Sequence, residues 1–163
     1  MRLETVGPHY PMSINAEYTN EGKGDCYESS LNALVDRKWK AHVPYADPQD
    51  WRLVHTMCLG QGPIEGVRFG HAFLLNKELR IVLDIANGKG GLIPALTYFA
   101  LGGVDPDAFP YYEYALKEVR DNMLKHGTYG PWGDAYDEIT RIEAESLAAA
   151  SIKNIGGQLG CDT

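Results

Sequence analysis

The sequence has few cysteines, and they are spread thinly. Of its 163 residues only Cys26, Cys58 and Cys161 are cysteines, and no two of them form a C-x-x-C unit. An odd, widely spaced set argues against a disulfide framework and against a zinc ribbon. We therefore expect no metal and no cofactor, and we assign no role to Cys58 or Cys161.

Basic side chains and long apolar runs are also scarce. The chain has 15 Lys and Arg against 22 Asp and Glu, a net charge of -7. This sign argues against a footprint on a phosphate backbone, so we expect no nucleic-acid partner. No run approaches the roughly 18 apolar residues of a membrane span, and residues 1–5 lack the apolar core of a signal peptide. We expect no membrane partner and a cytoplasmic location.

The composition that remains is that of a globular protein. Hydrophobic residues make up 44% and charged residues 23% of the chain. A chain of this length buries about two thirds of the surface that its unfolded form exposes, which predicts one domain over 1–163. From about residue 134 the apolar positions become sparse, and this segment is a candidate for a peripheral helical tail.

The most informative stretch is 20–32, with the sequence NEGKGDCYESSLN. Apolar residues follow it at helical spacing, and Asp25 is a good N-cap for a helix from 27 to about 40. Cys26 then lies in the first turn, where free N–H groups and the helix dipole favour a thiolate and can hold an oxyanion. We interpret Cys26 as a nucleophile. The alternative is a small buried hydrophobic residue.

A second region, 69–86, predicts a histidine and an acid on neighbouring strands. Residues 69–75 and 80–86 have strand composition, and 76–79 suits a hairpin link. A turn centred on residues 77 and 78 places His71 directly opposite Asp84, with Cβ atoms about 5 Å apart. The carboxylate would then orient the imidazole toward Cys26. The alternative is a pair that only satisfies a buried histidine.

The order of cysteine, strand histidine and acid resembles the papain-like superfamily in its broad sense, which includes papain-type and NlpC-type peptidases, transglutaminase-like proteins and arylamine N-acetyltransferases. Segments 24–28 (GDCYE) and 70–73 (GHAF) are similar to its cysteine and histidine segments. The resemblance implies an α+β fold in which the cysteine helix packs on a small antiparallel sheet, with additional C-terminal helices.

The resemblance also implies an oxyanion hole. Asn20 stands six positions before the cysteine, where papain-type enzymes have a glutamine, and it would act with the N–H of Cys26. The papain Gly-x-Cys-x-x-Cys-Trp signature is absent, because Ser29 and Ser30 follow Glu28. Several short motifs are similar in style to small bacteriophage proteins, which would place the chain in a host cytoplasm.

Alternatives to the triad come from the rest of the chain. His55, on a predicted strand over 51–59, and His126, near the end of a predicted helix over 111–126, compete with His71, and Asn87 competes with Asp84. Candidate substrate contacts are Tyr27, Arg68 and Trp132. Further helices are predicted over 92–101 and 135–153.

These residues predict a cysteine hydrolase of the peptidase or amidase type. Cys26, His71 and Asp84 would cleave a peptide, protein or small amide through a thioester. An acyltransferase of the transglutaminase or N-acetyltransferase type would use the same triad. A catalytically inactive papain-like interaction or inhibitor module is the third hypothesis, and the oligomeric state is left open.

Overall fold

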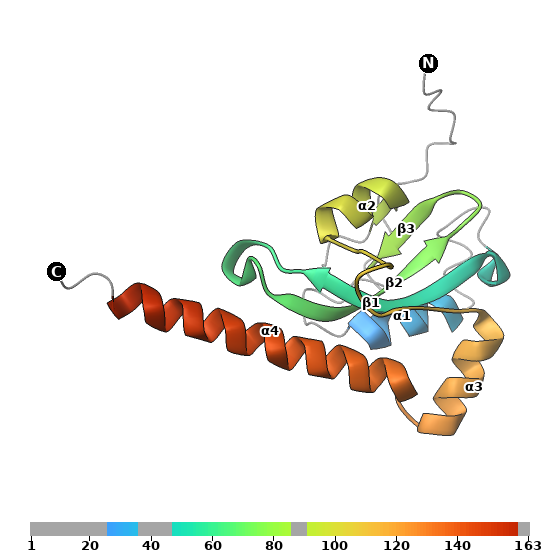
Figure 1. The fold of residues 1–163 in the computed structure, drawn as a ribbon. Helices are drawn as coiled ribbons and strands as arrows, with labels where there is room; N and C mark the ends of the chain where they lie inside the picture. Colours follow the sequence, from blue (N-terminus) through green and yellow to red (C-terminus); the bar gives the residue numbers. More distant parts are fainter. Residues whose placement is uncertain (1–25, 36–46, 86–90, 160–163) are drawn as a thin grey trace, which may run out of the picture.

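The computed structural model describes residues 26–35, 47–85 and 91–159, which form an α+β fold around one antiparallel sheet (Figure 1). The strands are β1 (Trp51–Leu59), β2 (Arg68–Asn76), β3 (Ile81–Asp84), β4 (Gly91–Pro94) and β5 (Tyr111–Tyr114), in the sheet order β4-β3-β2-β1-β5. The helices are α1 (Cys26–Val35), α2 (Ala95–Gly102), α3 (Leu116–His126) and α4 (Gly133–Leu159), with 3-10 turns η3 (Pro48–Asp50) and η4 (Gly62–Ile64). The predicted α+β class is confirmed.

Strand β1 has the predicted bounds, and its side chains alternate between two buried faces. Leu53 and His55 point to one face, and Val54 and Cys58 point to the other. Both faces are covered by helices, so β1 is buried along nearly its whole length and does not alternate between buried and exposed residues. We call the two sides the His55 face and the His71 face, after the buried histidine on each.

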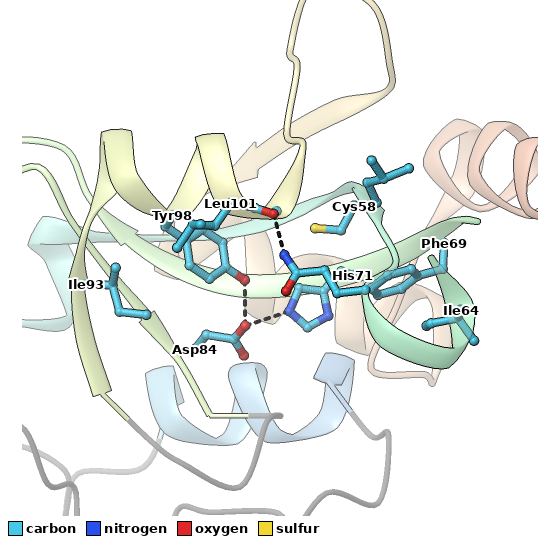
Figure 2. Close-up of a pocket in the computed structure, with 11 residues that line it drawn as sticks. Cys58, Ile64, Phe69, His71, Asp84, Ile93, Tyr98 and Leu101 are labelled. Atoms are coloured by element: carbon cyan, nitrogen blue, oxygen red, sulfur yellow. Dashed lines mark hydrogen bonds and ion pairs between the residues drawn. The ribbon is translucent and has the colours of Figure 1, made fainter. Parts of the chain in front are cut away.

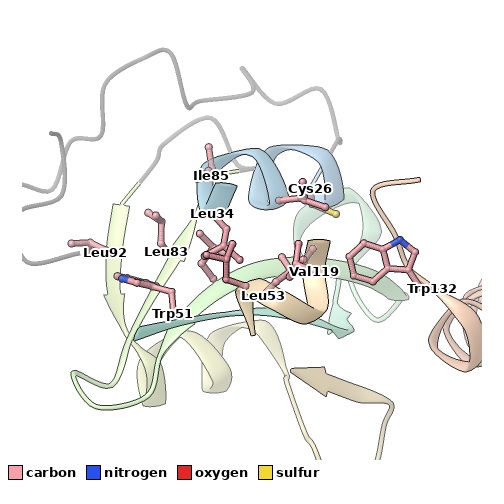
Figure 3. Close-up of a cluster of buried hydrophobic side chains, with 14 residues drawn as sticks. Cys26, Leu34, Trp51, Leu53, Leu83, Ile85, Leu92, Val119 and Trp132 are labelled. Carbon is pink, nitrogen blue, oxygen red and sulfur yellow. The ribbon is translucent and has the colours of Figure 1, made fainter. Parts of the chain in front are cut away.

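Different helices cover the two faces. Helices α1, α3 and the start of α4 pack on the His55 face, where Figure 3 shows Cys26 and Trp132 near one end of the cluster and Trp51 and Leu92 toward the other. Helix α2 lies on the His71 face, where Tyr98 packs with Phe73. The sheet therefore forms the middle of three layers.

The hairpin between β2 and β3 has a register different from the one predicted. Leu74 pairs with Leu83 and Asn76 with Ile81, so a four-residue turn joins the strands and His71 does not lie directly opposite Asp84. The shift amounts to two residues, which equals the side-chain period of a strand. His71 and Asp84 therefore still point to the same face, as diagonal neighbours.

Strand β2 runs beyond the end of β3. Side chains from helices bond to backbone groups of β2 along the part that β3 does not cover. In the described residues β3 pairs only with positions 74–76 of β2. Backbone groups of alternate β2 residues then bond to helix side chains: Arg68 N–H donates to Ser146 Oγ, Gly70 N–H donates to Glu143 Oε1, and Ser30 Oγ donates to the Ala72 carbonyl. Helices α1 and α4 are thereby fixed to the strand that carries His71.

Two of the predicted helices begin later in the chain than the sequence predicts. Residues 111–114, expected to be helical, form β5, because three tyrosines in four residues suit a strand and the edge of β1 was free to pair. Residues 91–94 form β4, and the helix starts only at Ala95. The expected ends are correct: Gly103 and Gly127 follow α2 and α3 with φ of 59° and 67°, the left-handed conformation of a helix C-cap.

Candidate functional site

Cys26 is the first residue of α1, as the sequence predicts. Its side chain is 6% exposed and borders the buried cluster on the His55 face. At this position the N–H groups of the first helical turn have no partner within the helix, so they are available to a negatively charged oxygen. Asp25, the expected cap, and Asn20, the expected oxyanion donor, lie outside the described residues.

His71 and Asp84 form a buried hydrogen bond. The His71 Nε2 lies 2.9 Å from Asp84 Oδ2, and the two residues are 7% and 5% exposed (Figure 2). Because Nε2 is engaged by the carboxylate, Nδ1 is the ring nitrogen left for another partner. The contact predicted between these two side chains is present in spite of the changed register.

Although α1 packs on the His55 face, Cys26 at its first position is close enough to the His71 ring to affect the pKa of that ring. Burial alone would lower the pKa of His71, but its interactions with Asp84 and with Cys26 outweigh burial and raise that pKa. The structure therefore favours an imidazolium at His71. The structure brings together the three side chains that the sequence singled out.

Tyr98 is a member of this cluster that the sequence did not indicate. Its hydroxyl donates to Asp84 Oδ2 at 2.5 Å, so Tyr98 and His71 share one carboxylate oxygen. Burial and the adjacent carboxylate raise the pKa of Tyr98, which keeps its hydroxyl protonated and able to donate. Tyr98 lies on α2, opposite the strands, and only knowledge of the packed fold identifies it.

His55, the main rival base, lies on the other face and has a different environment. It is fully buried among the rings of Tyr27, Tyr114 and Trp132, at centroid distances of 4.9, 5.1 and 5.0 Å. Neither ring nitrogen has a hydrogen-bond partner within the described part of the chain, and burial lowers the pKa of His55 to about 3. His55 is a neutral core histidine.

His126, the other rival, is exposed at the end of α3. It lines a separate hollow with Trp132 and Tyr136, and none of the residues lining that hollow belongs to the Cys26–His71–Asp84 cluster. Asn87, the alternative to Asp84, lies outside the described residues.

The three candidate substrate contacts have structural partners. Tyr27 packs edge-on against His55, and Trp132 is buried in the same cluster, with its Nε1 donating to the Thr128 carbonyl at 2.9 Å. Arg68 donates to the Gly103 carbonyl, and its guanidinium lies 4.0 Å from the centre of the Phe109 ring. None of the three lines the cavity beside His71.

That cavity has a volume of about 380 Å³ and lies between α2 and the loop after β1 (Figure 2). Its floor includes His71 and Asp84, and its described walls are otherwise mainly apolar. Cys58 also lines it, with a pKa that burial raises to about 12. The His71 ring therefore has the thiol of Cys26 as one neighbour and an apolar hollow as another.

The described segments contain neither a metal-binding cluster nor a membrane-spanning helix. No three His, Cys, Asp or Glu side chains in ranges 26–35, 47–85 and 91–159 gather in a way that would hold a metal ion. No helix in those ranges combines the length and apolar character needed to cross a bilayer.

Comparisons with known proteins identify no relative. The chain has no significant match to a protein-family model, to a curated protein or to a solved structure. Any functional conclusion must therefore come from the geometry of the Cys26, His71 and Asp84 side chains.

Proposed function

We propose that this protein is a cysteine hydrolase of the peptidase or amidase type, with Cys26 as nucleophile, His71 as general base and acid, and Asp84 as the orienting group. The observation that carries this proposal is an imidazole that bonds to a buried carboxylate at 2.9 Å and whose pKa is raised by a thiol at the first residue of a helix. A thiol beside a base that is itself oriented by an acid is the arrangement that activates a nucleophile.

His71 is the group that takes up the proton of the Cys26 thiol in this reaction. Asp84 and Cys26 raise the pKa of His71, so its ring binds a proton more strongly than a free imidazole does, and Nδ1 is the nitrogen that accepts the thiol proton. Asp84 stabilises the imidazolium through Nε2 and fixes the plane of the ring. Tyr98 holds the carboxylate oxygen that makes this bond.

Acylation then follows from the positions of these groups. The thiolate attacks the carbonyl carbon of an amide, a C–S bond forms, and the carbonyl π electrons move to oxygen. The N–H of Cys26, at the start of α1, supports that oxyanion. His71 gives its proton to the departing nitrogen, the C–N bond breaks, and a thioester on Cys26 remains.

Hydrolysis restores the site. His71, now neutral, removes a proton from a water molecule, and the oxygen attacks the thioester carbon. The C–S bond breaks, the carboxylic acid leaves, and Cys26 and His71 again share one proton. No group other than these side chains and water is needed to balance the reaction.

The burial of Cys26 favours acyl transfer as a second candidate. A thiol that is 6% exposed admits little water, so an amine bound beside His71 would compete well for the thioester. The chemistry is the same, except that His71 removes the proton from an amine instead of from water.

The test is acylation by p-nitrophenyl acetate followed by mass spectrometry. We expect one acetyl group on the peptide that contains Cys26, loss of that group with time, and no acetyl group on Cys58. Iodoacetamide should likewise label Cys26 below about pH 8 and much faster than Cys58, whose thiol burial keeps protonated. Equal, slow labelling of all thiols would contradict the proposal and favour an inactive interaction module.

A further inference from the structure

The cavity on the His71 face is the feature that the proposed function leaves unused. It is enclosed by α2 on one side and by η4 and the start of β2 on the other (Figure 2). Gln61 links the two sides, because its Nε2 donates to the Leu101 carbonyl at 2.6 Å. A volume of about 380 Å³ is in the range of pockets that hold a small ligand.

The position of the cavity relative to the reacting groups indicates which part of a substrate would enter it. Among the described residues its lining includes His71 and Asp84 and does not include Cys26. In the proposed reaction the acyl group is bonded to Cys26, whereas the amine is the group that exchanges a proton with His71. A cavity beside the imidazole therefore lies on the amine side of the scissile bond.

The chemistry of the walls indicates what kind of amine fits. The described lining is dominated by aliphatic and aromatic side chains, among them Ile64, Phe69, Ile93 and Leu101. Its charged side chains are His71 and Asp84, which already bond to each other. A charged substituent placed there would lose its hydration without gaining a partner, whereas an apolar one would gain by leaving water.

We infer that this cavity is a specificity pocket for an apolar side chain on the amine side of the bond that is made or broken at Cys26. The inference rests on the proposed function and adds a substrate class to it: amides whose amine portion resembles leucine or phenylalanine. The same pocket would select the amine acceptor in acyl transfer, because acceptor and leaving amine occupy one position in forward and reverse reactions.

The test measures how the acetyl-enzyme on Cys26 divides between water and added amines. Acetylation is carried out with p-nitrophenyl acetate in the presence of leucinamide, phenylalaninamide or glycinamide, and the N-acetyl amides are quantified. In the productive step the amine nitrogen attacks the thioester carbon, His71 accepts the amine proton, and the C–S bond breaks. We expect leucinamide and phenylalaninamide to capture the acetyl group about tenfold better than glycinamide.

Two variants examine the cavity wall, and a third serves as a matched control. Ile64→Ser and Leu101→Ser place a hydroxyl at the rim, where the side chains are 51% and 65% exposed, so folding should be retained. Leu96→Ser makes the same change on α2 at a site that is 82% exposed and does not line the cavity. The preference for leucinamide should fall to about twofold or less in the first two variants and stay near tenfold in the third.

The outcomes separate this inference from the function on which it rests. If Cys26 is acetylated and the three amines compete equally, the pocket assignment is overturned and the nucleophile assignment stands. If leucinamide is preferred but all three serine variants behave alike, the pocket assignment is again overturned, since the preference arises elsewhere. If no acetyl group reaches Cys26, both proposals fail.

Discussion

His55 and His71 are two buried histidines on neighbouring strands, and they face opposite sides of the same sheet. His55 is 0% exposed and His71 is 7% exposed, so burial does not distinguish them. Their pKa values nevertheless shift in opposite directions. His71 has a carboxylate and a thiol within reach, whereas His55 has aromatic rings. The partner of a buried imidazole, and not its burial, decides whether the ring carries a charge.

The two faces also differ in how well they are filled. A Cβ added at Gly70, on the His55 face, would lie 2.5 Å from Ile139 Cγ2 and 2.6 Å from the Tyr27 hydroxyl oxygen. A Cβ added at Gly102, beside the cavity on the His71 face, would meet nothing closer than 3.6 Å. The His55 face is a packed core. The His71 face combines polar, hydrogen-bonded groups with free space, as expected of a binding site.

Replacing each histidine in turn is the strongest test of this comparison. His71→Asn should lower the rate of acetylation by p-nitrophenyl acetate by about a thousandfold, because the proton acceptor is lost. His55→Leu should leave that rate within about threefold, because it removes only a neutral core side chain. The release of p-nitrophenolate measures both rates, and similar losses in the two variants would contradict the distinction.

The pH dependence of stability should reveal the two histidines separately. The folded-state pKa of His55 is about 3, below its ordinary value of 6.5, so the unfolded chain binds more protons in between and stability falls as the pH drops below 6.5. From pH 6.5 to 4.5 the loss of stability amounts to about 2 kcal/mol. Below about pH 5.5 His71 is protonated in both states, so it adds little to this change. Its raised pKa adds stability that is lost instead as the pH rises above 6.5.

Urea unfolding at several pH values checks this, with His55→Leu as the comparison. The variant should lose the acid-side slope that belongs to His55 and keep the alkaline slope that belongs to His71. An unchanged slope between pH 4.5 and 6.5 in the variant would show that other groups cause the acid instability.

The difference in packing predicts a smaller effect. Gly70→Ala should destabilise the fold by about 2 kcal/mol, since Ile139 and the edge contacts of α4 must move to admit the methyl group. Gly102→Ala should change the free energy of unfolding by less than about 0.5 kcal/mol, because its methyl group has room. Thermal unfolding of both variants measures the contrast, and equal losses would show that the cavity side is as tightly packed.

The smallest expected effect concerns Tyr98. Tyr98→Phe removes one donor from Asp84 and should slow acetylation of Cys26 about fivefold to tenfold, because the carboxylate then orients His71 less well. Tyr136→Phe, at an exposed site on α4, is the control and should have no effect. A positioning role also predicts a changed pH profile of iodoacetamide labelling in Tyr98→Phe, which a purely structural role would not produce.

Local patterns in the sequence predicted much of this structure. Both ends of strand 51–59 are predicted correctly, because a segment of strand composition ends there at a glycine-rich turn. The prediction that His71 and Asp84 lie on the same face of the sheet is correct, although the predicted register is wrong by two residues. An error of one residue would have separated them, so the success depended on the period of the strand.

Features that depend on distant packing were not predictable. Residues 111–114 satisfy a helical pattern, and only the free edge of β1 makes them a strand. Tyr98 contacts Asp84 because α2 crosses the end of β3, which no local signal indicates. The burial of Trp132 and the backbone bond of Arg68 likewise follow from the docking of helices and loops on the sheet.

The side-chain bonds along β2 have a consequence for self-association. A strand edge with unpaired N–H groups is a template for another chain, and here Ser146 and Glu143 occupy those donors in place of a sixth strand. Helix α4 therefore prevents another chain from adding a strand to β2, the strand that carries His71. Any partner that pulls α4 away would expose the N–H groups of Arg68 and Gly70, directly before His71 on the same strand.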